Sequence, residues 1–136
     1  MRRRALLAVI LVLAVLFSGC SGGEVSQVNK IIGDSEVYSR AEIGRAMNVV
    51  IRCFKNGFEG CTLTELEYDE EISEKYSSDW AEKYDADEGI VLISSFHVDA
   101  SGGDGSLEPN STYKNYQWVL TRSGITGWKL QTWGYA

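Results

Sequence analysis

Histidine, cysteine and acidic side chains are the residues whose types and spacing could form a metal or catalytic site in this chain. His97 is the only histidine, and no cysteine stands at a zinc-ligand spacing from it. The acidic runs at 69–71 and 85–88 lack the alternating oxygen ligands, glycine and terminal glutamate of a calcium-binding loop. The sequence therefore predicts no metal site, no cofactor and no catalytic residue, and we expect His97 to be a half-buried structural residue in a strand.

Cys20 is preceded by a segment typical of exported proteins. Arg2, Arg3 and Arg4 come before an uncharged apolar run from Ala5 to Phe17, which is the order of charges and apolar residues in a signal peptide. As a helix this run is roughly 20 Å long, which is short of the roughly 30 Å of a hydrocarbon core. We therefore expect export and cleavage, rather than a permanent membrane span.

The residues directly before the predicted cleavage point favour a lipid anchor. Phe17, Ser18, Gly19 and Cys20 resemble the site read by lipoprotein signal peptidase, in which a large apolar residue and two small residues precede a cysteine. The cysteine thiol is the nucleophile that accepts a diacylglyceryl group, and two acyl chains anchor a protein stably. The sequence predicts a signal peptide over 1–19, a lipidated flexible tether over 20–35 and a single domain over 36–136, held on the extracytoplasmic side of the cell membrane.

The net charge of the predicted exported part argues against nucleic acid as a partner. Removal of residues 1–19 takes away three of the 13 basic residues and none of the 19 acidic ones, which leaves a net charge of about −9. Such a chain offers no basic stripe to a nucleic acid, so we expect none as a partner.

Cys53 and Cys61 are the two cysteines that remain beside the predicted lipidation site. In an oxidising compartment an even pair of cysteines favours a disulfide. The alternative is two unrelated thiols, because Cys53 falls on the apolar face of a predicted helix.

The longest predicted element is a helix over 40–56. Ser39 and Glu42 form a capping box at its start, and Gly57 follows its end. Apolar residues recur at helical spacing along one face, which predicts packing on one side. These are Ile43, Met47, Val50 and Phe54, whereas the opposite face carries Arg45, Asn48, Arg52 and Lys55.

Four strands and one more helix complete the predicted order. Alternating or β-branched runs predict strands over 62–68, 90–98, 116–122 and 128–135, the last two joined by a turn at 123–127. A short helix or helical turn is expected around Trp80 and Tyr84. The predicted fold class is α+β: a long N-terminal helix packed on a four-stranded antiparallel sheet, with one additional short helix.

The aromatic residues suggest a possible binding face. Trp133 and Tyr135 fall on one side of the last strand by alternation, and we expect them to share a face of the sheet with residues of the two preceding strands. An uncovered apolar face would mark a binding site, whereas cover by the short helix and the tether would make it core. The residues of this predicted face are Val91, Ile93, His97, Val119, Trp133 and Tyr135.

Several motifs together resemble a known group of proteins. The segments at 87–92, 102–107, 110–113, 116–118 and 128–135 are similar, in their order, to a family of small uncharacterised lipoproteins of Gram-positive anaerobic bacteria. The order of helices and strands also resembles cystatin-like and nuclear-transport-factor-like folds. The resemblance implies an exported, lipid-anchored protein and brings no catalytic residues with it.

Three functions remain open from the sequence. The first is a non-enzymatic surface domain that binds a small ligand, a peptide or an envelope protein through the helix–sheet cleft or the Trp133 face. The second is a small hydrolase or isomerase of the nuclear-transport-factor-like type, with His97 in a pocket. The third is a cystatin-like inhibitor that uses the turn at 123–127.

Overall fold

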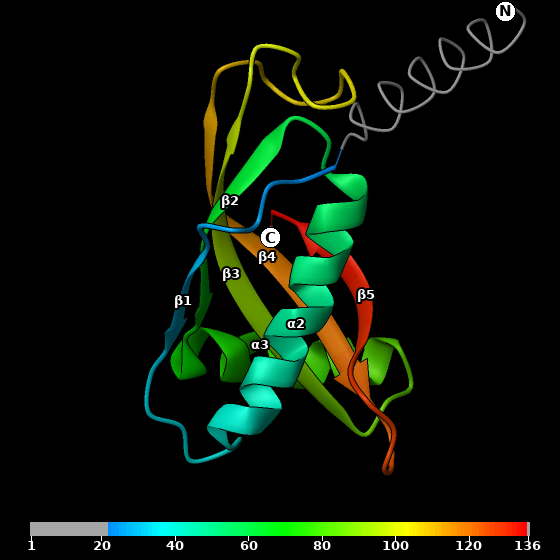
Figure 1. Ribbon diagram of the computed structural model, residues 1–136. Coiled ribbons are helices and arrows are strands. Elements are labelled where there is room, and N and C mark those ends of the chain that lie inside the picture. The colour runs from blue at the N-terminus through cyan, green and yellow to red at the C-terminus, as the bar shows by residue number, and fades with distance from the viewer. Residues whose placement is uncertain (1–21, 136) are drawn as a thin grey trace, which may run out of the picture.

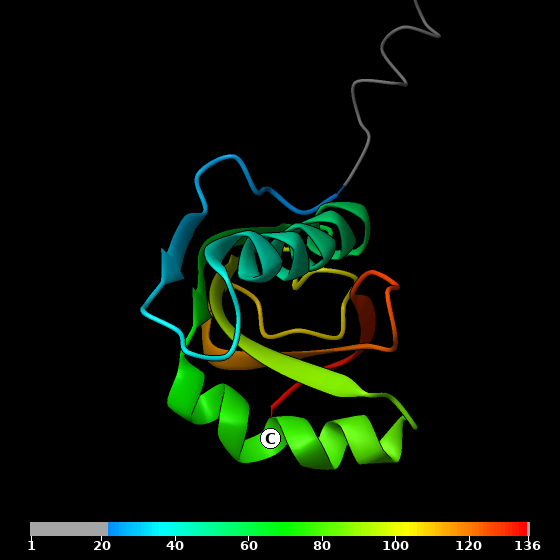
Figure 2. The same ribbon diagram turned by 90° about the horizontal axis from the view of Figure 1, so that it is seen from below.

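Two helices enclose a twisted sheet from opposite sides. The computed structural model describes residues 22–135, so the predicted signal peptide and the lipidation site at Cys20 lie outside the described part. Helix α2 (Arg40–Gly57) covers one face of the sheet and α3 (Glu70–Lys83) covers the other, which gives three layers (Figures 1 and 2). The predicted α+β class is confirmed.

The capping box predicted at the start of α2 is confirmed. The Ser39 hydroxyl accepts a hydrogen bond from the Glu42 backbone N–H at 3.1 Å, and the Ser39 N–H donates to the Glu42 carboxylate at 2.8 Å. The apolar face buries Ile43, Ala46, Met47, Val50 and Phe54 against the sheet, as the helical spacing predicts.

The sheet has five strands and is mixed, so the predicted four-stranded antiparallel sheet is wrong in this respect. The strands lie in chain order: β1 (Asn29–Ile32), β2 (Cys61–Tyr68), β3 (Glu88–Val98), β4 (Thr112–Arg122) and β5 (Lys129–Gly134). Strands β2 to β5 pair antiparallel, whereas β1 pairs parallel with β2. Helix α2 connects β1 and β2 because parallel neighbours need a crossover connection.

Strand β1 lies within the segment predicted as a flexible tether. Its pairing runs from Asn29 opposite Glu65 to Ile32 opposite Tyr68, and Glu24 forms an isolated bridge with Thr62. Glu24 and residues 29–32 of this segment are therefore paired with β2.

Helix α3 is longer than the short helix expected and covers much of the second sheet face. Asp69 caps it by accepting a hydrogen bond from the Ile72 N–H at 3.1 Å. The helix approaches β3 at Gly89, where a Cβ atom would lie only 2.6 Å from the backbone oxygen of Ser77. Glycine allows this close approach, and the buried Ser73 hydroxyl accepts a hydrogen bond from the Val91 N–H at 3.1 Å.

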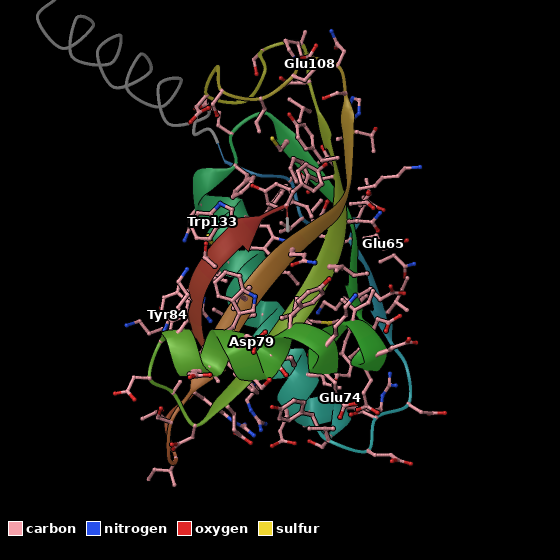
Figure 3. All side chains as sticks on the ribbon, turned by 180° about the vertical axis from the view of Figure 1, so that it is seen from behind. Glu65, Glu74, Asp79, Tyr84, Glu108 and Trp133 are labelled. Atoms are coloured by element: carbon pink, nitrogen blue, oxygen red, sulfur yellow. The ribbon has the colours of Figure 1, made fainter. Side chains whose placement is uncertain are left out.

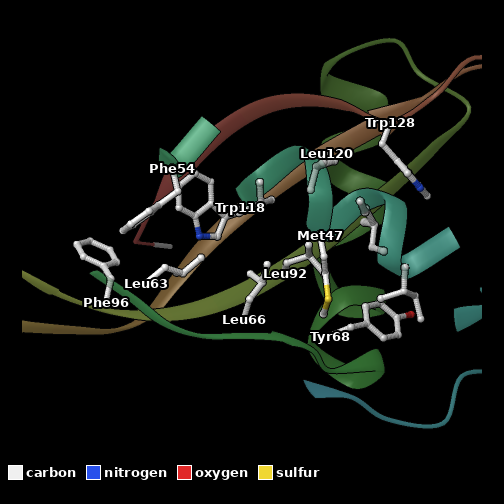
Figure 4. Close-up of a cluster of buried hydrophobic side chains, with 14 of the residues drawn as sticks. Met47, Phe54, Leu63, Leu66, Tyr68, Leu92, Phe96, Trp118, Leu120 and Trp128 are labelled. Atoms are coloured by element: carbon white, nitrogen blue, oxygen red, sulfur yellow. The ribbon is translucent and has the colours of Figure 1, made fainter. Parts of the chain in front are cut away.

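The space between α2 and the sheet is filled by side chains (Figure 4). Phe54, Phe96 and Trp118 are fully buried, with ring centroids 5.6 Å apart for Phe54 and Phe96 and 6.4 Å apart for Phe54 and Trp118. The one buried polar group of Trp118 is satisfied, because its Nε1–H donates to the Ser94 hydroxyl at 2.8 Å.

Candidate functional site

The residues of the predicted binding face lie together only in part: Val119, Trp133 and Tyr135 line one small hollow with Trp80 of α3. Val91 and Val119 are buried, on the face that α3 covers, and Ile93 is partly buried beside them in β3. Trp133 instead pairs with Trp118, and the two rings stack with centroids 5.7 Å apart. The Trp133 ring therefore packs on the α2 side of the sheet, although Trp133 and Tyr135 also line the small hollow with Val119 at the edge of the sheet.

An irregularity in the pairing of β4 with β5 explains the position of the Trp133 ring. Leu120 pairs with Leu130, but Val119 pairs with Thr132, so Gln131 is an extra residue on β5. A single extra residue reverses the side of the sheet on which later side chains lie. Alternation read from Trp128 onward therefore does not give the side on which the Trp133 ring packs.

On the α2 side, Trp133 and Tyr135 complete an aromatic cluster at the end of the sheet. Trp133 is 45 % exposed and Tyr135 is 60 % exposed, and both lie over more deeply placed rings. Figure 3 shows Trp133 beside β5, above the end of α3 that carries Tyr84. The cluster consists of Phe54, Phe58, Phe96, Tyr113, Tyr116, Trp118, Trp133 and Tyr135.

His97, Cys53 and Cys61 do not form a common site in the part of the chain that the structure describes. His97 is exposed, rather than half-buried as expected, and its Nδ1 lies 3.3 Å from the Thr112 hydroxyl. Cys53 and Cys61, the pair for which the sequence suggests a disulfide, are both free thiols, and burial raises the pKa of each. Within residues 22–135 no cluster of three histidine, cysteine or acidic side chains is arranged to hold a metal ion.

A hollow of about 430 Å³ lies between the outer side of α2 and the turn that joins β4 to β5. We call it the helix–hairpin groove. Ligand sites in proteins commonly have volumes of this size. Helix α2 lines it with basic and amide side chains, and the turn lines it with backbone and apolar side chains. The lining residues are Arg45, Asn48, Val49, Arg52, Arg122, Gly124, Ile125, Thr126, Gly127 and Trp128.

Arg122 fixes the two sides of the groove to each other. Its guanidinium bonds the Glu42 carboxylate of α2 at 2.9 Å and also pairs with Glu88 of β3. The same group lies 4.3 Å from the centre of the Trp128 ring, whose Nε1–H donates to the Glu42 backbone oxygen at 3.1 Å. The floor of the groove is therefore held by contacts among strands β3 and β4, helix α2 and the turn that precedes β5.

The charge of Arg122 is balanced by its carboxylate partners. The pKa of Glu42 is lowered to about 2, first by the hydrogen bond from the Ser39 backbone and then by the bond from Arg122. The same pairs raise the pKa of Arg122, with the hydrogen bond to Glu88 as the largest cause. Burial raises the pKa of the neighbouring Tyr38 to about 12. Arg122 and Glu42 are both charged at neutral pH, and each stabilises the charged form of the other.

Arg45 and Arg52 differ from Arg122 because no carboxylate of residues 22–135 forms an ion pair with them. Within residues 22–135 every ion pair involves Arg122. Arg45 and Arg52 are exposed, stand seven residues apart and so lie two turns apart on one side of α2, with exposed Asn48 between them. The groove therefore offers two guanidinium groups and an amide beside an apolar wall, which is chemistry suited to an anion.

Comparisons with models of protein families, with curated proteins and with solved structures give no significant match. In the part of the chain from residue 22 to residue 135, no helix has the length and apolar character to cross a membrane.

Sequence reasoning missed the groove although its basic half was visible. The outer side of the predicted helix carries Arg45, Asn48, Arg52 and Lys55 in an otherwise acidic chain. That concentration of positive charge on one helix side could have indicated an anion-binding site. Its other wall comes from a turn more than seventy residues later, and the pattern of the helix alone does not identify that partner.

Proposed function

We propose that the protein is a lipid-anchored, non-enzymatic binding domain on the extracytoplasmic side of the cell membrane, and that the helix–hairpin groove holds an anionic ligand. The lipid anchor is the one proposed at Cys20 from the sequence. The observation that carries the proposal is the pair of exposed, carboxylate-free guanidinium groups of Arg45 and Arg52 on one wall of a ligand-sized hollow.

The groove offers both charged and apolar surface to such a ligand. Guanidinium groups bind carboxylates and phosphates through pairs of charge-assisted hydrogen bonds, and Asn48 adds an amide donor. Val49 and Trp128 offer apolar surface to an uncharged part of the ligand.

The filled interior supports a binding domain over the enzyme considered from the sequence. A pocket of the nuclear-transport-factor-like type would lie between the long helix and the sheet, where Phe54, Phe96 and Trp118 are fully buried. His97, the proposed catalytic residue of that alternative, is exposed at the end of β3.

Titration with inorganic phosphate tests the proposed site. We expect phosphate to shift the NMR signals of the Arg45 and Arg52 Nε–H groups in the isotope-labelled mature chain, held in micelles of an uncharged detergent. Replacing both arginines by glutamine is expected to weaken phosphate binding at least tenfold, because each lost charge-assisted hydrogen bond contributes about 1.5–3 kcal/mol.

The matched control is the double variant Lys75→Gln, Lys83→Gln, which makes the same change in net charge on α3. It should leave phosphate affinity unchanged. Equal weakening by both double variants, or none by the Arg45→Gln, Arg52→Gln variant, would contradict a specific site in the groove.

A further inference from the structure

We propose that the anion held in the helix–hairpin groove is the phosphodiester of an anionic lipid in the same membrane that carries the anchor. The inference rests on the proposed function, because it takes both the lipid on Cys20 and the anion-binding groove as given. The domain then lies with the outer side of α2 against the membrane surface.

The described chain begins in contact with the last turn of α2. The Gly23 N–H donates to the Lys55 backbone oxygen at 3.0 Å, and a Cβ atom on Gly22 would lie 2.3 Å from the same oxygen. The chain is therefore pressed against the last turn of α2. Cys20 is two residues before Gly22 in the sequence, and two residues of chain span at most about 7 Å.

This point lies on one side of the three-layered molecule. Figure 2 shows that the described chain begins on the α2 side of the sheet, whereas α3 lies on the opposite side. A lipid on Cys20 therefore brings the membrane close to the α2 side, near Lys55 and one turn of helix from Arg52.

Charge is distributed unevenly over the surface of the domain. The outer side of α2 carries exposed Arg45, Arg52 and Lys55, and its one acidic residue, Glu42, is paired with Arg122. The opposite side of the molecule carries many of the acidic groups of the domain, and Figure 3 shows Glu65, Glu74 and Asp79 on it. A domain of net negative charge thus presents a basic side along α2, with Glu24 as an acidic neighbour of Lys55 near the proposed anchor.

An anionic bilayer favours this orientation over all others. Each basic side chain close to such a surface increases membrane affinity about fivefold. The acidic side chains of α3 lie on the far side of the sheet, where screening over a Debye length of about 8 Å weakens their repulsion by the membrane.

An apolar side chain lies on the rim of the groove. Ile125 lies at the tip of the turn between β4 and β5 and is fully exposed. Beside a headgroup bound in the groove, it would enter the boundary between headgroups and acyl chains, where apolar residues of peripheral proteins are buried.

Acylation of lysines on the native chain tests this orientation. The lipidated protein is reconstituted into vesicles of phosphatidylcholine, or of equal parts phosphatidylcholine and phosphatidylglycerol, and treated with an uncharged acylating reagent. Mass spectrometry then gives the acylation rates of Lys55, on the outer side of α2, and of Lys75, on α3. We expect phosphatidylglycerol to slow the reaction of Lys55 several-fold and to leave Lys75 unchanged.

The double variant Arg45→Gln, Arg52→Gln should lower the ratio of docked to undocked protein roughly twenty-five-fold, at about fivefold for each residue, and restore the Lys55 rate. The Lys83→Gln variant should keep the slow rate.

Equal Lys55 rates on both vesicles, with the diacylglyceryl mass present on Cys20, would overturn this inference alone. Absence of that mass would instead overturn the anchor. Protection by inorganic phosphate on phosphatidylcholine vesicles, as strong as that by phosphatidylglycerol, would identify a soluble anion as the ligand and also overturn the inference.

Discussion

Replacing Trp118 by alanine is expected to lower the free energy of unfolding by about 3–5 kcal/mol, which is the usual cost of removing a large buried aromatic side chain. Trp118 is fully buried in β4, and its ring centroid lies 5.3 Å from that of Phe58 and 5.7 Å from that of Trp133. The substitution also removes the Trp118 Nε1–H, which donates a hydrogen bond to the Ser94 hydroxyl. Since small domains are stable by only about 5–15 kcal/mol, this is a large part of the total.

Urea unfolding followed by circular dichroism measures this loss. Trp118→Phe should cost less, because it keeps most of the apolar surface and loses only the hydrogen bond and part of the ring. Trp80→Ala is the matched control, since Trp80 is only partly buried on α3. A loss for Trp118→Ala no greater than that for Trp80→Ala would contradict the described core.

Replacing Cys20 by alanine is expected to abolish lipid attachment completely. In the proposed lipoprotein the Cys20 sulfur is the atom that accepts the diacylglyceryl group, and neither Cys53 nor Cys61 follows an apolar run of the required kind. Cells grown with labelled palmitate should incorporate the label into the wild-type chain and into a Cys53→Ala control, but not into the Cys20→Ala variant.

The same samples show how the signal peptide is processed. The wild-type chain should begin at lipid-modified Cys20, whereas the Cys20→Ala variant should retain residues 1–19. A variant that is still cleaved would indicate an ordinary secretory signal, and unchanged palmitate incorporation would show that the lipid is carried elsewhere.

The features that the sequence predicts well are those set by neighbours along the chain. The capping box of Ser39 and Glu42 and the apolar spacing from Ile43 to Phe54 are local, and both are confirmed in α2. The antiparallel pairing of β4 with β5 also follows from the short turn that joins two alternating runs.

The features that the sequence does not predict depend on distant partners. Strand β1 has only four residues and is held by parallel pairing with β2, more than thirty residues away along the chain. The extra residue Gln131 in β5 is defined only by its pairing with β4. That single residue places the Trp133 ring on the α2 side of the sheet.

The helix–hairpin groove combines both kinds of feature. Arg45, Asn48 and Arg52 are recognisable on one side of a predicted helix, but the groove exists because Arg122 and Trp128 hold the turn against Glu42. One wall of the proposed anion site can therefore be predicted from the helix sequence, whereas the other wall depends on tertiary contacts.

A crystal structure of the mature chain with a short-chain phosphatidylglycerol is the most direct test of the central claim, that the groove binds an anionic headgroup. We predict a phosphate group in the groove with oxygen atoms within ion-pair distance of the guanidinium groups of both Arg45 and Arg52, and with Asn48 beside it. An empty groove at saturating lipid, or a phosphate bound instead near the aromatic cluster around Trp133, would contradict the claim.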